Sequence, residues 1–137
     1  MKRFEKITEL IPALESKKKY GTWVVDAKHK GTSDDPIQMP FVGYENVVYE
    51  LTERIYDCVD ANKNMDVHDY WGVLNSYEIP DEEAILAADI SKLDARCTLA
   101  LILTIIRSDR FHEGLLLEYL DNGMMLKWLK HLKEIDK

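Results

Sequence analysis

The fold of this chain is decided by the sequence CTLALILTII, which runs from Cys97 to Ile106 and is interrupted only by two threonines. Apolar residues occupy nearly every face of a helical wheel here, so the stretch predicts a helix covered by its neighbours on all sides. The preceding sequence SKLD, residues 91–94, resembles a capping box with Asp in place of Glu or Gln. Arg107 marks the point where the helix leaves the core. We therefore expect a buried central helix over about residues 91–107.

The sequence after this stretch predicts two more helices. Ser108 or Asp109 is a candidate N-cap for a helix that ends at the terminator Asn122-Gly123. The expected apolar stripe of that helix is Leu115, Leu116, Tyr119 and Leu120. The last helix has its stripe at Met125, Leu129 and Leu132, with Trp128 and Ile135 beside it. The second half of the chain is therefore predicted to be a helical bundle.

The first half mixes helical and extended patterns. Helical spacing predicts helices over about residues 2–18, where Pro12 would introduce a kink or a late start, and over 45–60. Pro80 followed by the acidic residues 81–83 is typical of the start of another helix. The segments WVV at 23–25 and IQMPFV at 37–42 favour a small β-hairpin near residues 22–43, joined by a turn at 31–36. The predicted fold class is mainly α (α+β), as a single domain over residues 1–137.

Composition and charge narrow the function classes. The chain has 137 residues, 46% of them hydrophobic, which is enough to bury a core without disulfides or metals. The formal charge is −7, and residues 45–94 alone carry thirteen acidic and three basic groups, while both ends are mildly basic. An acidic chain is a poor ligand for a phosphate backbone, so we expect no nucleic-acid partner. The acidic stretch is instead a candidate docking face for a basic partner.

Few motifs of known chemistry are present. The sequence contains no GxGxxG, GxxxxGK[ST] or GxSxG pattern, so we predict no cofactor and no catalytic residue, which favours a non-catalytic function. Asp60–Asp66 begins like an EF-hand loop, but Met65 replaces the glycine and Trp71 replaces the bidentate glutamate, so we predict no metal site. Two cysteines without CxxC spacing, no signal peptide and no apolar run of about 20 residues predict a cytoplasmic protein without a membrane partner.

The sequence RSDRFHEG, residues 107–114, is the strongest candidate for a ligand site. Its two arginines stand three residues apart beside an expected helix junction, an arrangement that can hold a carboxylate or phosphate. The alternative is an internal network of ion pairs. Its members would be Arg107, Arg110, Glu113, Asp89, Asp94 and Glu118.

The same residues carry a resemblance. The sequence LTIIRSDRFHEG, residues 103–114, resembles the C-terminal block of an uncharacterised prokaryotic family that is catalogued only as a domain of unknown function. MPFVGY at 39–44, DYW at 69–71 and AD at 88–89 are similar to its other motifs, and the likeness covers about residues 20–135. Phe41 stands where the family pattern has Tyr, so no role for that hydroxyl carries over. The resemblance implies a small single-domain protein without a known activity, and it directs attention to Asp69, Trp71, Asp89, Arg107, Arg110, Phe111, Glu113 and Gly114.

These positions suggest a specific arrangement. Asp69 and Asp89 would pair with Arg107 or Arg110 at the end of the central helix, and Trp71 and Phe111 would cover the pair. Gly114 would allow two helices to approach closely. A sealed cluster of this kind would be structural, whereas a partly open one would be the best pocket in the protein.

Two function hypotheses follow from the sequence. The first is a small cytoplasmic non-catalytic binding or protein-interaction domain, with a homodimer through an apolar helix face as one form of partner. The alternative is a protein or enzyme that binds a small anionic metabolite or nucleotide through Arg107 and Arg110.

Overall fold

The central helix, α6, spans Ala95–Ser108 in the computed structural model, which describes residues 3–17, 19–25, 32, 34 and 40–136. Every residue from Cys97 to Ile106 is buried, as its all-apolar pattern predicts. The helix begins later than the sequence pattern indicated. Asp94, with extended backbone, is its N-cap and accepts a hydrogen bond from the Cys97 amide at 2.9 Å. The preceding residues form a separate 3₁₀ turn, η2, at Ile90–Lys92, so SKLD is not a capping box around Ser91.

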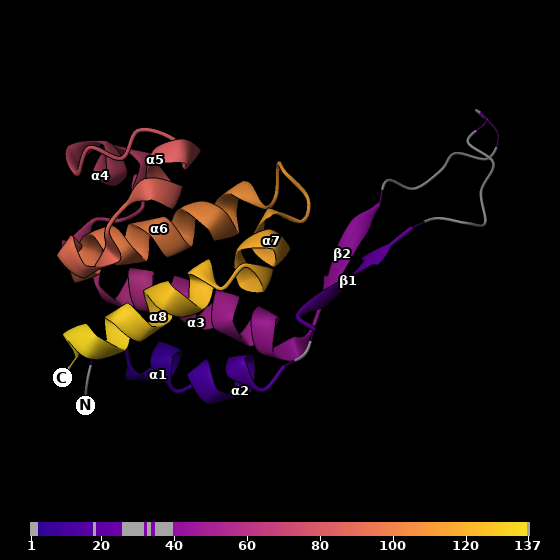
Figure 1. Ribbon diagram of the computed structural model, residues 1–137, viewed down its shortest axis with the longest axis horizontal. Coiled ribbons are helices and arrows are strands. Elements are labelled where there is room, and N and C mark those ends of the chain that lie inside the picture. The colour runs from indigo at the N-terminus through magenta and orange to yellow at the C-terminus, as the bar shows by residue number, and fades with distance from the viewer. Residues whose placement is uncertain (1–2, 18, 26–31, 33, 35–39, 137) are drawn as a thin grey trace.

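Other helices surround α6 (Figure 1). They are α3 (Asn46–Ala61), α4 (Tyr70–Ser76), α5 (Glu82–Ala87), α7 (Leu115–Asp121) and α8 (Met124–Ile135). The expected stripes of α7 and α8 are buried, and Trp128 is fully buried with Tyr119 stacked on it. The helix predicted at 45–60 is confirmed as α3, and Asp81 caps α5 at the acidic start that the sequence indicated. The prediction of a mainly helical fold with a small hairpin is therefore confirmed.

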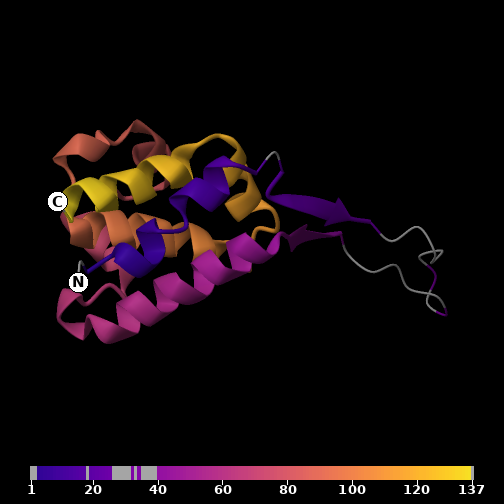
Figure 2. The same ribbon diagram turned by 90° about the horizontal axis from the view of Figure 1, so that it is seen from below.

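The N-terminal segment departs from prediction. Instead of one helix over 2–18, the chain forms two short ones, α1 (Glu5–Thr8) and α2 (Ile11–Glu15). Pro12 lies in the first turn of α2, where a backbone N–H would have no partner within the helix. In the interior of one long helix, the same proline would remove a hydrogen bond, so the chain forms two helices instead. Both pack their apolar residues against α3 and α8 (Figure 2). The Phe4 amide donates to the Asp136 carboxylate at 2.9 Å, which joins the two ends of the fold.

The hairpin consists of β1 (Gly21–Val24) and β2 (Phe41–Tyr44), paired antiparallel with Trp23 opposite Val42. It projects from the end of the helical body where α7 lies (Figures 1 and 2). The predicted turn and the first residues of the second arm fall largely outside the described residues. Among the residues that the structure describes, no helix is long and apolar enough to cross a membrane.

Candidate functional site

Residues 109–114, here called the junction loop, connect α6 to α7 and contain most of the RSDRFHEG sequence. A helix capped by Ser108 or Asp109 was predicted here, and this prediction is wrong: α7 begins only at Leu115. Ser108 instead accepts hydrogen bonds at its carbonyl from the amides of Phe111 and His112, both at 3.0 Å. These turns fold the loop back on the end of α6, so that one side faces the hairpin and the other faces α4 and α5.

On the hairpin side, Asp109 is the centre of a hydrogen-bond network. Its carboxylate accepts from the Tyr44 hydroxyl, at 3.1 and 3.2 Å to its two oxygens, and from the Leu116 amide at 3.0 Å. The Tyr44 hydroxyl in turn accepts from the Leu117 amide at 3.2 Å. Burial and the negative charge of Asp109 raise the pKa of Tyr44. Asp109 thus ties β2 to the first turn of α7.

Glu113 and Gly114 complete this attachment. Glu113 accepts a hydrogen bond from the buried Val42 amide at 2.7 Å. Gly114 has φ of +91°, and a Cβ atom built there would lie 2.4 Å from the Trp23 ring. The position therefore requires glycine both for its left-handed backbone and for the close approach of an indole. Gly114 was expected to allow two helices to approach closely. It instead allows Trp23 of the hairpin to approach the start of α7.

Arg107 is a structural residue in the same region. The hydroxyls of Tyr56 on α3 and Tyr70 on α4 lie beside its guanidinium and raise its pKa. Three helices therefore meet at one half-buried arginine. Arg110, by contrast, is exposed and has no ion pair or side-chain hydrogen bond within the described part of the chain. The two arginines do not form a common anion clamp.

The predicted pairing of Asp69 and Asp89 with these arginines is wrong. Asp69 caps α4 by accepting from the Gly72 amide at 3.1 Å. Asp89 caps η2, where its bonds to the Ser91 hydroxyl (2.7 Å) and amide (3.1 Å) lower its pKa, with a smaller contribution from Lys92. Both carboxylates satisfy amides or hydroxyls two or three residues away. Local capping requires almost no loop closure, so it prevails over a distant, solvent-screened ion pair.

The other side of the junction loop is open. Trp71 and Phe111 line one pocket of about 230 Å³, as expected from the prediction that they cover a common site. The described residues form no ion pair beneath them. Phe111 is 92% exposed and Trp71 is 36% exposed. The floor and walls are completed by Ile85, Thr104, Ile105 and Leu115, and polar groups come from Glu82, Ser108 and His112. The pocket is thus apolar at its floor and polar at its rim.

Sequence reasoning missed two residues of this region. Tyr44 is the last residue of the MPFVGY motif, so that motif contained the signal for it. Glu82 was assigned only to a helix start, but its carboxylate accepts a hydrogen bond from the Tyr119 hydroxyl at 3.1 Å on the pocket wall. Burial, followed by the charge of Glu82, raises the pKa of Tyr119. No sequence signal connected these two residues, which lie 37 positions apart.

Within the described ranges, no group of three His, Cys, Asp or Glu side chains is arranged to hold a metal ion. Fold and site together define a mainly helical protein with a small β-hairpin and an open aromatic pocket. The family model described as "Family of unknown function (DUF6508)" matches residues 1–137, and the chain belongs to this family. No curated protein and no solved structure matches the chain.

Proposed function

We propose that this chain is a cytoplasmic, non-catalytic protein-interaction domain whose Trp71–Phe111 pocket binds an apolar side chain from a basic segment of a partner protein. The observation that carries the proposal is the Phe111 ring, which is 92% exposed at the edge of a pocket with an apolar floor. The fold makes little use of this ring. A large aromatic side chain left in water beside a second aromatic is typical of the anchor residues of protein interfaces.

The shape of the pocket supports a side chain rather than a free metabolite as its occupant. A volume of about 230 Å³ is below the usual range of about 300–1,000 Å³ for small-molecule sites. The junction loop and α4 flank the pocket, so an extended segment could lie across it with one anchor inserted. Trp71 and Phe111 would then contact the two sides of that anchor.

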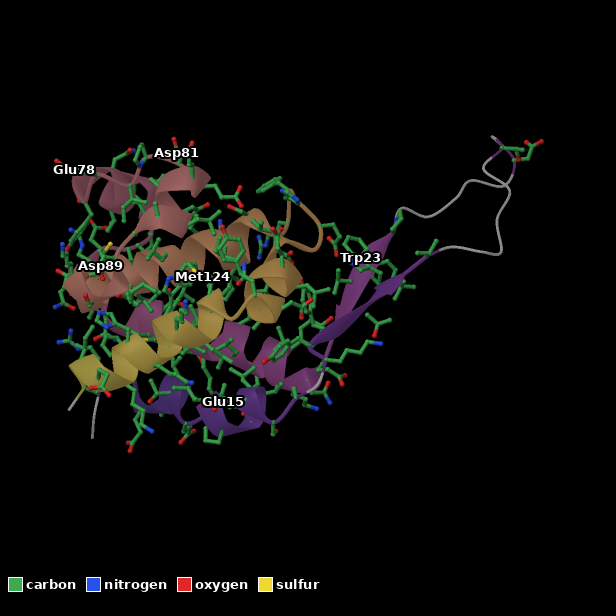
Figure 3. The ribbon with its side chains drawn as sticks, in the orientation of Figure 1. Glu15, Trp23, Glu78, Asp81, Asp89 and Met124 are labelled. Carbon is green, nitrogen blue, oxygen red and sulfur yellow. The ribbon has the colours of Figure 1, made fainter. Side chains whose placement is uncertain are left out.

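The charge around the pocket supports a basic partner. The α4–α5 side carries exposed carboxylates at Asp69, Glu78, Asp81, Glu82 and Glu83. Figure 3 shows Glu78 and Asp81 on this side of the molecule. Complementary charge mainly increases the rate of association and determines which partner is selected, while the apolar anchor supplies affinity. Lys or Arg residues next to the anchor would meet Glu82, the carboxylate that lines the pocket, and then the other carboxylates of the α4–α5 side.

The alternative, an anion-binding protein or enzyme that uses Arg107 and Arg110, is less well supported. Arg107 is engaged by Tyr56 and Tyr70, and it does not line the aromatic pocket. Arg110 alone offers one exposed cation without a second group to fix an anion. The cytoplasmic part of the proposal rests on the two free cysteines, Cys58 and Cys97.

The test is selection from a random-peptide display library with the full chain as bait and the Trp71→Ala variant as the matched bait. We expect the wild-type chain to enrich peptides with one aromatic or large aliphatic residue flanked by Lys or Arg, and Trp71→Ala to lose them. Enrichment of the same sequences by both baits would contradict the proposal. So would the absence of enrichment, or self-association through this pocket in light scattering, which would make a second copy of the chain the occupant.

A further inference from the structure

A second pocket lies far from the junction loop, between the N-terminal segment and α3. It has a volume of about 310 Å³. Arg3, Lys6 and Ile7 line it from one side, and Arg54, Cys58 and Ala61 line it from α3. None of these residues takes part in the Trp71–Phe111 pocket. The three cations on its wall, in a chain with a net charge of −7, distinguish it from its surroundings.

The three cations are not equivalent. Arg54 forms ion pairs with Glu9 and Glu50, and it also donates to the carbonyl of Lys6. Two carboxylates therefore pair with this one guanidinium, so Arg54 is not available to bind an anion. Arg3 and Lys6 have no ion pair within the described part of the chain. The Arg3 guanidinium lies 3.8 Å from the Met65 sulfur and over the Phe4 ring, whose centroid is 5.9 Å from the guanidinium carbon.

The floor of this pocket is apolar. Ile7 is 1% exposed and Cys58 is half-buried, so the pocket leads from charged groups at the surface to a mostly apolar wall. The Asn62 amide also lies on this wall, where it donates to the Cys58 carbonyl at 2.8 Å. Burial raises the pKa of the Cys58 thiol, which keeps it uncharged near neutral pH. A wall of this kind favours an apolar group, and the two cations above it favour a negative one.

We propose that the pocket between α1 and α3 binds a small amphiphilic carboxylate. The carboxylate contacts Arg3 and Lys6, and a short aliphatic or aromatic tail covers Ile7, Ala61 and Cys58. Asp57, also on the pocket wall, limits the charge that the site accepts. The apolar wall gives a carboxylate with a hydrocarbon tail a contact that inorganic phosphate lacks. This second site does not depend on the protein-interaction function proposed above.

Cys58 provides a direct reporter for the site. The experiment measures the rate of Cys58 alkylation by iodoacetamide in the full chain, at mildly alkaline pH, with hexanoate, with inorganic phosphate, or with chloride at matched ionic strength. Hexanoate in the pocket should shield the thiol, so at about ten times its Kd the rate should fall about tenfold. Cys97 is 0% exposed and should stay unmodified throughout, which reports that the chain remains folded.

Three variants separate the proposal from non-specific protection. The double variant Arg3→Gln/Lys6→Gln should lose the protection by hexanoate, and the matched surface variant Lys127→Gln should retain it. Asp57→Asn should lower the hexanoate concentration needed for half-protection by several-fold, because it removes a like charge. Equal protection in the double variant, no protection in the wild type, or protection by phosphate as strong as by hexanoate would each overturn the proposal.

Discussion

On its hairpin side, the junction loop has carboxylates that accept hydrogen bonds from β2. On its α4 side, the same loop leaves the Phe111 ring 92% exposed. Asp109 and Glu113 bind groups of β2, and Gly114 admits the Trp23 ring, which lies between the hairpin and α7 (Figure 3). Phe111, in the same loop, stabilises no comparable contact. The junction loop therefore combines residues that attach the hairpin with residues that remain available for a partner. Substitutions on the two sides should therefore have opposite consequences.

The largest loss of stability is expected on the hairpin side, from Gly114→Ala. The new Cβ would clash with Trp23 and would impose a left-handed backbone on alanine, so we expect the free energy of unfolding to fall by about 3 kcal/mol. Gly123→Ala is the matched control, because Gly123 also has a positive φ, of +82°, but nothing lies within 4 Å of its Cβ position. It should cost about 1–2 kcal/mol. Urea denaturation would measure both, and equal losses would show that the Trp23 contact is unimportant.

Asp109→Ala should have the next largest effect. It removes the acceptor of the Tyr44 hydroxyl and the Leu116 amide, and loss of hydrogen bonds to a charged group predicts about 2 kcal/mol of destabilisation. Asp81→Ala, which loses one exposed N-cap bond to the Ala84 amide, should cost about 1 kcal/mol. If the two variants were equally stable by denaturation, the attachment of the hairpin would not depend on the Asp109 network.

Tyr44→Phe should have a smaller effect that depends on pH. The folded pKa of Tyr44 is raised above its unfolded value of about 10, so the network's stabilisation is complete below pH 10. It is lost as the pH rises further, because the unfolded chain gives up this proton first. Tyr44→Phe should lower stability by about 1 kcal/mol at neutral pH and should flatten the alkaline decline. Denaturation curves at several pH values test this, and an unchanged alkaline slope would contradict it.

The helices could be predicted from sequence to a greater extent than the site. The all-apolar run at 97–106 and the stripes of α3, α7 and α8 are periodic signals that tertiary packing reinforces. The start of α7 could not be predicted, because the Asp109 carboxylate does not cap a helix that begins directly after it. It binds the Tyr44 hydroxyl, 65 residues away, and the amide of Leu116, seven residues further along the chain. Asp69 and Asp89 were expected to form distant ion pairs with arginines, but each caps the helix that directly follows it. The proximity of Trp71 and Phe111 was expected, but for a cluster that does not form.

The most direct test of this two-sided loop is one paired measurement on Phe111→Ser. We expect a free energy of unfolding within about 0.5 kcal/mol of the wild type, because the ring is exposed, together with at least tenfold weaker binding of a peptide selected by the wild-type chain. Destabilisation by about 2 kcal/mol or more would mean that Phe111 belongs to the fold. Unchanged peptide affinity would mean that the open side of the junction loop is not the binding surface.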